Sequence, residues 1–260
     1  MKKMKRTLGL LVLIVILGAG LNAFGFLGFG NSVSWQEEVL LHDGSKIIVE
    51  RSQSYGGRHE IGQSGPVKEQ KIMFTLPGTK QKITWNNEYG EDIGRANFEL
   101  LALHVLKGTP YIVTTPRLCL SYNKWGRPNP PYVIFKYMDA AWQRIPLEEL
   151  PAEFTTLNLT IETKGYEKKI VGQGLVSAEK VRNLNNSLRQ PEYKTILREP
   201  KKPEDLCPEE IQTQSGGWRG IGWFSRQPDY KACMKVCDHE RVSPEHCPCD
   251  RLFNKNNKEK

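Results

Sequence analysis

The six cysteines of this 260-residue chain are its most reactive side chains. Five lie close together near the end and one lies far upstream, so the set is Cys119, Cys207, Cys233, Cys237, Cys247 and Cys249. Outside the cytoplasm, cysteines in a short segment rich in glycine and proline are typical of disulfides that supplement a small core. The sequence alone does not fix their pairing. Because five is an odd number, either Cys119 pairs with one of the tail cysteines or two thiols stay free.

The same cysteines offer a second chemistry, the binding of a soft metal ion such as zinc. Cys233 and Cys237 are four residues apart, Cys247 and Cys249 flank Pro248, and two histidines lie between the pairs. Neither pair has the usual two-residue gap, and cysteines on either side of a proline are poorly placed to direct both sulfurs at one ion. We therefore expect disulfides, with no metal and no other cofactor. A metal-binding or redox tail is the alternative.

A stretch stiffened by three prolines, from residue 119 to 132, carries the second candidate site. Its aromatic rings can stack on a ligand, its two cations can hold an anion, and its stiffness lowers the entropy lost when a partner docks. The candidate binding-loop residues are Tyr122, Lys124, Trp125, Arg127 and Tyr132. The alternative is a structural loop whose aromatic side chains pack on a sheet. A shorter aromatic stretch, residues 216–224, is expected to pack on the tail disulfides.

Two histidines stand next to a carboxylate, at His42-Asp43 and at His59-Glu60. Neighbours on a strand point to opposite faces, so neither pair acts together unless it lies in a turn. His42-Asp43 is expected in a turn, where Asp is common for backbone reasons. His104 lies among apolar residues and is expected to be a packed core residue. The sequence has no nucleophile elbow and no His-Glu-x-x-His motif, so we assign no catalytic residue.

The elements that must hold these residues are predicted to be strands from residue 34 to about 163. Short β-branched and aromatic runs alternate there with turn residues. Hairpins are predicted at residues 39–49, 72–85 and 132–145. Residues 98–106 fit either a helix or the first strand of a hairpin that ends at 113, and we favour the hairpin. Alternation of apolar and polar residues predicts a further strand at 157–161. We expect a mainly β fold, a small sandwich or open barrel of antiparallel hairpins, followed by one C-terminal helix and a Cys-rich tail.

Composition divides the chain into four parts. Residues 1–30 form an N-terminal membrane anchor or signal peptide, and residues 31–165 form the β domain. Residues 166–199 form an extension with a helix that begins after Ser177, a typical N-cap residue. Residues 200–260 form the Cys-rich tail.

The N-terminal segment determines the expected location. Four cations precede Thr7, and residues 8–29 are long and apolar enough to cross a bilayer. Small residues within the segment also suit signal-peptide cleavage. Cations remain on the cytoplasmic side of a membrane, and none follows the segment before Lys46. We expect an inner-membrane protein with a single pass, a cytoplasmic N-terminus and a periplasmic body, or a periplasmic protein after cleavage.

The formal net charge is +8, which on its own suggests binding to nucleic acid. Cations gather at both ends, however, and basic and acidic residues interleave between them, as in residues 68–71. The sequence shows no aromatic and basic motif of a nucleic-acid-binding module. We expect no nucleic-acid partner. The expected partners are the membrane, through residues 8–29, and another envelope protein.

Four segments resemble a family of uncharacterised proteins of Gram-negative bacteria. They are residues 37–44, 57–63, 119–132 and 190–199, so that the resemblance covers the chain from Trp35 to Glu199. The resemblance implies an envelope protein and supplies no activity and no catalytic residue. The Cys-rich end departs from it. We expect a membrane-anchored or exported envelope protein with a non-enzymatic binding or structural role. An enzyme acting on an envelope substrate is the alternative.

Overall fold

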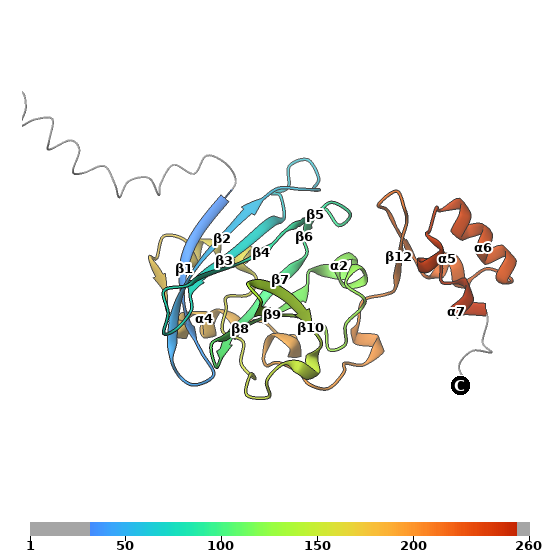
Figure 1. The fold of residues 1–260 in the computed structure, drawn as a ribbon. Coiled ribbons are helices and arrows are strands. Elements are labelled where there is room, and N and C mark those ends of the chain that lie inside the picture. Colours follow the sequence, from blue (N-terminus) through green and yellow to red (C-terminus); the bar gives the residue numbers. More distant parts are fainter. Residues whose placement is uncertain (1–31, 254–260) are drawn as a thin grey trace, which may run out of the picture.

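A computed structural model describes residues 32–253. The body consists of two main sheets of mostly antiparallel strands (Figure 1). The first has the order β11-β1-β2-β3-β4, with β1 Ser32–Leu40, β2 Lys46–Tyr55, β3 Val67–Thr75, β4 Lys82–Asn87 and β11 Leu175–Val176. The second has the order β10-β9-β8-β7, with β7 Phe98–Leu106, β8 Thr109–Pro116, β9 Val133–Met138 and β10 Ala141–Ile145. The described part is mainly β, as predicted. Neither sheet closes into a barrel.

Two small hairpins complete the strands, β5 Tyr89–Gly90 with β6 Arg95–Ala96, and β12 Glu210–Gln212 with β13 Trp218–Gly220. The helices are α2 Leu118–Lys124, α3 Thr163–Ile170, α4 Ala178–Asn185, α5 Gly222–Ser225, α6 Tyr230–His239 and α7 Cys249–Phe253. Short 3-10 turns span Leu147–Glu149, Pro191–Tyr193, Pro203–Asp205 and Pro244–His246. The predicted helix is α4, and the Ser177 hydroxyl caps it by accepting a hydrogen bond from the Lys180 amide. The structure also contains further short helices that the sequence analysis did not predict.

The four predicted hairpins are all present. In the first, β1 and β2 pair around a turn in which Gly44 has a φ of +83°, and Asp43 accepts a hydrogen bond from the Ser45 amide. In the third, β7 and β8 pair around Lys107 and Gly108, which both have positive φ angles. Such a two-residue turn matches the twist of the strands that flank it. Turn residues therefore located these strands correctly.

The predicted strand at residues 157–161 is absent, and its place is taken by an extended segment that belongs to no sheet. Its backbone bonds to several side chains, and the Leu159 amide also donates a hydrogen bond to the Leu101 carbonyl of β7. Glu37 accepts a hydrogen bond from the Thr160 amide, Arg51 donates one to the Thr160 carbonyl, and Asn185 bonds to the backbone of Ile161 and Leu159. The polar residues of the segment, Asn158 and Thr160, are themselves buried, so the alternation did not mark a solvent-exposed face.

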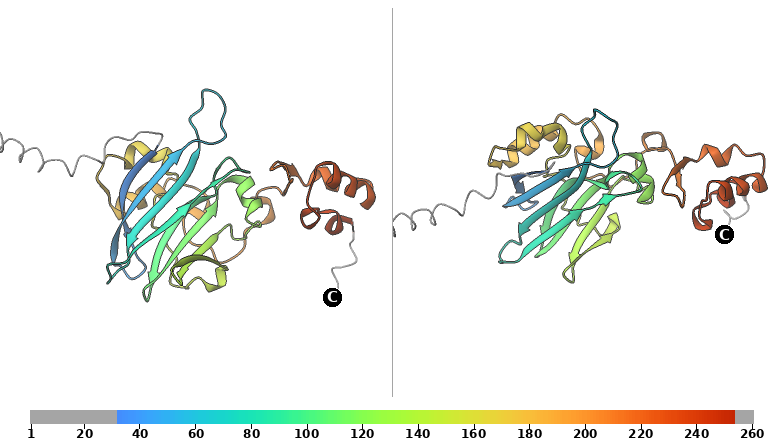
Figure 2. Two further views of the ribbon diagram at one scale, coloured as in Figure 1. Left: turned by 45° about the horizontal axis from the view of Figure 1, so that its top comes forward. Right: turned by 90° about the horizontal axis from the view of Figure 1, so that it is seen from above.

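One face of the first sheet is covered by two different neighbours. Near the start of β1, Trp35 packs against side chains of α3 and α4. Figure 2 shows the ribbons of these helices over this face of the sheet. Further along, Val39 joins a cluster that includes Phe98 and Ile112 of the second sheet. Between these apolar parts lies the ion pair of Glu37 and Arg51, whose side chains are 0% and 1% exposed. This core joins both sheets and the two helices into one body.

Among residues 32–253, no helix has the length and apolarity that a membrane crossing requires. The predicted membrane segment, residues 8–29, lies outside the described residues.

Candidate functional site

All six cysteines lie in the described part and form three disulfides. Cys119 pairs with Cys207, Cys233 with Cys249, and Cys237 with Cys247. The prediction of disulfides is confirmed, and the alternative of two free thiols is wrong. Cys119 pairs with one of the five tail cysteines, and the other four pair among themselves.

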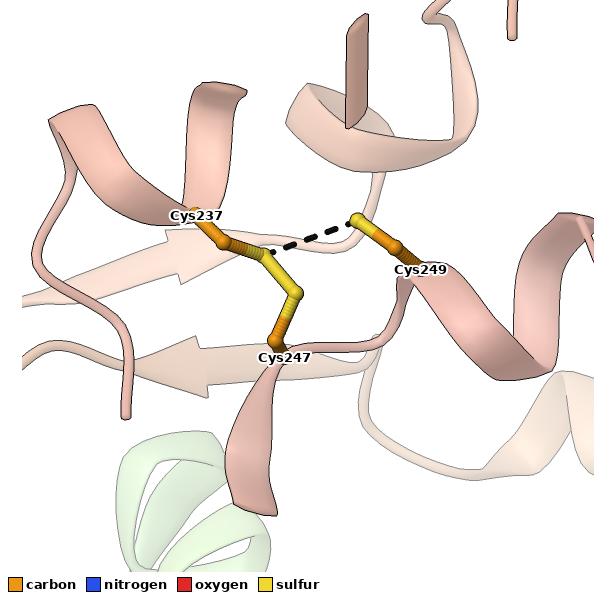
Figure 3. Close-up of side chains that lie close together, drawn as sticks. All are labelled: Cys237, Cys247 and Cys249. Atoms are coloured by element: carbon orange, nitrogen blue, oxygen red, sulfur yellow. Dashed lines mark hydrogen bonds between the residues drawn. A yellow bond between two sulfur atoms is a disulfide. The ribbon is translucent and has the colours of Figure 1, made fainter. Parts of the chain in front are cut away.

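The tail has a hydrophobic core of its own, built around its two internal disulfides. Ile211, Phe224 and Val242 pack there with the four cysteines. Figure 3 shows the Cys237–Cys247 disulfide with the Cys249 sulfur beside it. Because this core is small, the disulfides supply much of its stability.

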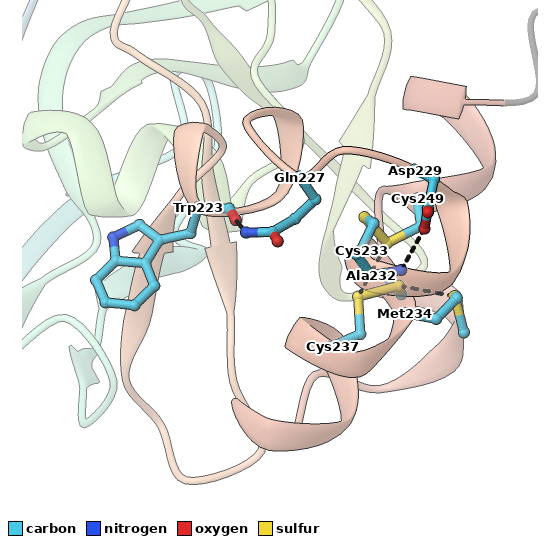
Figure 4. Close-up of a disulfide and its surroundings, with 9 residues drawn as sticks. Trp223, Gln227, Asp229, Ala232, Cys233, Met234, Cys237 and Cys249 are labelled. Atoms are coloured by element: carbon cyan, nitrogen blue, oxygen red, sulfur yellow. Dashed lines mark hydrogen bonds between the residues drawn. A yellow bond between two sulfur atoms is a disulfide. The ribbon is translucent and has the colours of Figure 1, made fainter.

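The aromatic side chains of residues 216–224 divide between the inside and the outside of the tail. Phe224 is fully buried in the tail core, as expected. Trp223, in contrast, is 58% exposed and points away from the disulfides (Figure 4). The expectation that it packs on them was wrong, because the two residues are neighbours on the short helix α5 and face different sides.

The Cys119–Cys207 disulfide attaches the tail to α2, and Asn123 strengthens this attachment. The Asn123 side-chain amide donates hydrogen bonds to the carbonyls of Cys119 and Pro208, both at 2.9 Å. Its oxygen accepts hydrogen bonds from the Glu210 amide and from Arg127, also at 2.9 Å. One amide side chain therefore links the helix, the loop after it and the first strand of the tail.

Asp92 makes a second link between the body and the tail. Its carboxylate lies 2.7 Å from the Lys124 ammonium and accepts a hydrogen bond of 3.0 Å from Gln212. The Trp218 indole donates to the Asp92 carbonyl at 3.3 Å. The β12–β13 hairpin is thus held against the turn between β5 and β6 as well as against α2.

A groove of about 610 Å³ follows this junction and is the candidate functional site. Lys124 and Arg127 line it from the body, and Glu209, His246 and Arg251 line it from the tail. Both candidate sets from the sequence, the binding loop and the Cys-rich tail, therefore meet at one place. The lining carries both signs of charge, and Arg251 forms an ion pair with Glu209.

The aromatic members of the predicted binding loop do not line this groove. Tyr122 and Tyr132 are 4% and 5% exposed, and burial raises the pKa of Tyr132 to about 12. Trp125 is partly buried, packs on Phe98 at 4.5 Å between ring centroids, and donates a hydrogen bond to Asn97. These rings position the loop, and its polar residues reach the groove.

The histidine and carboxylate neighbours at His42-Asp43 and His59-Glu60 bond elsewhere, with His59 on the Gly57 carbonyl and Glu60 on Gln63. Asp43 bonds to Ser45 in the turn, whereas the His42 ring packs against Phe154 at 5.0 Å. His104 is fully buried and stacks on the same phenylalanine, and burial lowers its pKa to about 4. The expectation that His104 is a packed core residue agrees with this arrangement.

Two anchors of the groove, Asn123 and Asp92, were not among the predicted site residues. Asn123 lies between the candidate residues Tyr122 and Lys124, so the sequence could have indicated it. Asp92 lies in a turn, where Asp is common, and nothing in the sequence connects it with the tail.

No family model matches the chain, and neither curated proteins nor solved structures gave a match. The resemblance to Gram-negative envelope proteins therefore stays a prediction.

Proposed function

We propose that this chain is an exported or membrane-anchored envelope protein of the bacterial periplasm, with a non-enzymatic role in binding another envelope protein. The observation that carries the proposal is the pairing of all six cysteines. Disulfides persist in oxidising compartments and are rare in the cytosol. The cations before residue 7 and the apolar segment after them direct the same part of the chain outward.

The groove between α2 and the tail is the proposed binding surface. It is open, it carries both signs of charge, and it exists only while the tail is attached to the body. Mixed charges at such a rim favour specificity and orientation of a protein partner. The partner is therefore a polypeptide with charged side chains of both signs.

Site-specific photo-crosslinking in living cells tests this proposal. A crosslinking amino acid at His246, which is exposed and lines the groove, should capture one envelope protein that mass spectrometry then identifies. The matched control is Lys80, which is exposed in the turn between β3 and β4 and should not capture that protein. In the Cys119→Ser/Cys207→Ser variant the capture at His246 should be lost.

Two outcomes would contradict the proposal. Identical products from positions 246 and 80, or capture that persists without the Cys119–Cys207 disulfide, would exclude the groove as the binding surface. A reporter fused after Lys260 that is active only in the cytosol would exclude the exported location.

A further inference from the structure

Four cysteine sulfurs converge in the tail more closely than two separate disulfides require. The sulfur atoms of Cys237, Cys247 and Cys249 lie within 4.8 Å of one another, and Cys237 Sγ is only 3.6 Å from Cys249 Sγ, to which it is not bonded (Figure 3). Cys233 Sγ is not one of these three close sulfurs, but it is bonded to Cys249 Sγ and so lies next to them. The two disulfides are therefore in contact.

This spacing is that of sulfur ligands around one metal ion. A tetrahedral zinc ion with Zn–S bonds of about 2.3 Å separates its ligands by about 3.8 Å. The 3.6 Å contact between Cys237 and Cys249 already has this length. Once reduced, the sulfurs of each bonded pair would have to move apart by only about 1.7 Å, since a disulfide bond is about 2.05 Å long.

The backbone around the cluster also suits a shared ion. Cys233 and Cys237 lie one turn apart on the same face of α6, and both are buried. Cys247 and Cys249 flank Pro248, yet their sulfurs converge, because Cys247 ends the 3-10 turn and Cys249 begins α7. Pro248 therefore does not keep the sulfurs of Cys247 and Cys249 apart, contrary to the expectation from the sequence.

We propose that the reduced tail binds one zinc ion through the thiolates of Cys233, Cys237, Cys247 and Cys249. The two tail disulfides are reduced by two equivalents of a dithiol, each giving two electrons and two protons to one disulfide and becoming a disulfide itself. Zn²⁺ then binds the four sulfurs and displaces their protons to solvent. The ion joins the same two segments as the disulfides do, so either form holds α6 to the start of α7.

This inference goes beyond the proposed function and does not depend on it. A tail that is cross-linked by zinc when reduced and by disulfides when oxidised keeps its fold across a change of compartment. Its groove residues, such as Glu209 and Arg251, would stay in place in both forms.

Cobalt binding by the purified full-length chain in detergent tests the inference. The chain is reduced with a phosphine, which leaves no competing thiol, and titrated with Co²⁺ as the probe. One Co²⁺ per chain should bind, with thiolate-to-cobalt charge-transfer bands and the visible bands of tetrahedral geometry. The oxidised chain should show neither. Native mass spectrometry should find one zinc ion when Zn²⁺ replaces Co²⁺.

Matched variants assign the ligands. Cys249→Ser should weaken Co²⁺ binding by more than the roughly 10- to 100-fold that loss of an outer-shell partner causes. Cys119→Ser/Cys207→Ser removes the one pair outside the cluster and should bind as the wild type does. Protease resistance of the tail, lost on reduction, should return when the metal is added.

Three results would overturn the inference. They are no uptake of cobalt by the reduced chain, binding by Cys249→Ser as tight as that of the wild type, and binding of metal while the tail stays protease-sensitive. The last result would indicate binding by an unfolded tail. None of these results bears on the groove or on export, so a failure here leaves the proposed function to its own test.

Discussion

Removal of the Cys119–Cys207 disulfide is the sharpest test of how body and tail form one site. Both residues are half-buried, so replacing each by serine leaves neither a large cavity nor a deeply buried hydroxyl. The disulfide closes a loop with a sequence separation of 88 residues, whereas the other two close loops of 16 and 10. Loop length therefore determines how much each one contributes.

The chain-entropy relation gives the magnitude. A loop of about 88 residues corresponds to about 4 to 5 kcal/mol at 25 °C, and a loop of about 10 residues to about 3 kcal/mol. Cys119→Ser/Cys207→Ser should thus lower the free energy of unfolding by about 4 to 5 kcal/mol. Cys237→Ala/Cys247→Ala, a control that adds no hydroxyl to the buried Cys237 site, should lower it by about 3 kcal/mol and destabilise the tail alone.

Urea unfolding under non-reducing conditions measures both losses, and limited proteolysis shows where each variant opens. In the first variant the hydrogen bonds of Asn123 and Asp92 no longer suffice to fix the tail on the body, so cleavage should begin near residue 207. A loss below about 1 kcal/mol for the longer loop, or equal losses for both variants, would refute the entropic reasoning.

Three further predictions concern the body. Trp125→Ala should lower the unfolding free energy by about 2 kcal/mol, because the ring is partly buried; unchanged urea stability would place it on the surface instead. Burial lowers the pKa of His104 to about 4 in the folded protein. As the pH falls, the unfolded chain therefore takes up a proton at this histidine before the folded protein does. Stability should therefore be full above pH 6.5 and fall by on the order of 3 kcal/mol towards pH 4, and a His104→Gln variant that keeps this pH dependence would contradict the assignment. Arg51→Met should destabilise by about 3 to 5 kcal/mol by stranding the Glu37 carboxylate, and Glu37→Met/Arg51→Met should restore much of that loss in a double-mutant cycle.

The sequence predicted the strands well where turn residues set them. Gly44 and Gly108 adopt the positive φ angles that tight hairpins require, so their positions locate the ends of β1, β2, β7 and β8. The 157–161 segment failed for a physical reason. Alternation predicts a strand only if the polar face is wet, and here the Asn158 and Thr160 side chains are both buried. The Asn158 side chain accepts a hydrogen bond from the Leu103 amide, and the Thr160 amide donates one to Glu37.

The helix α2 gave no signal before the structure. Arg117, the residue before it, supplies no capping side chain, and the helix has only seven residues. Too few apolar positions repeat over that length for a helical period to emerge. Its importance comes from what it carries, Cys119 and Asn123, and these meet the tail only through contacts 85 to 88 residues apart in sequence.

Residue types alone predict that Cys119 has a partner in the tail, but they do not locate the groove. Cysteine chemistry predicted that Cys119 has a partner among the five tail cysteines, because an odd number cannot pair within itself. Which of the five it pairs with depends on where the tail core places the other four. That core keeps Cys233, Cys237, Cys247 and Cys249 together and leaves Cys207 at its edge, beside α2. The pairing, and with it the groove, therefore follows from the packing of the tail. A chain whose tail core is disrupted, when oxidised in the presence of a thiol and its disulfide, should form other pairs and lose the groove.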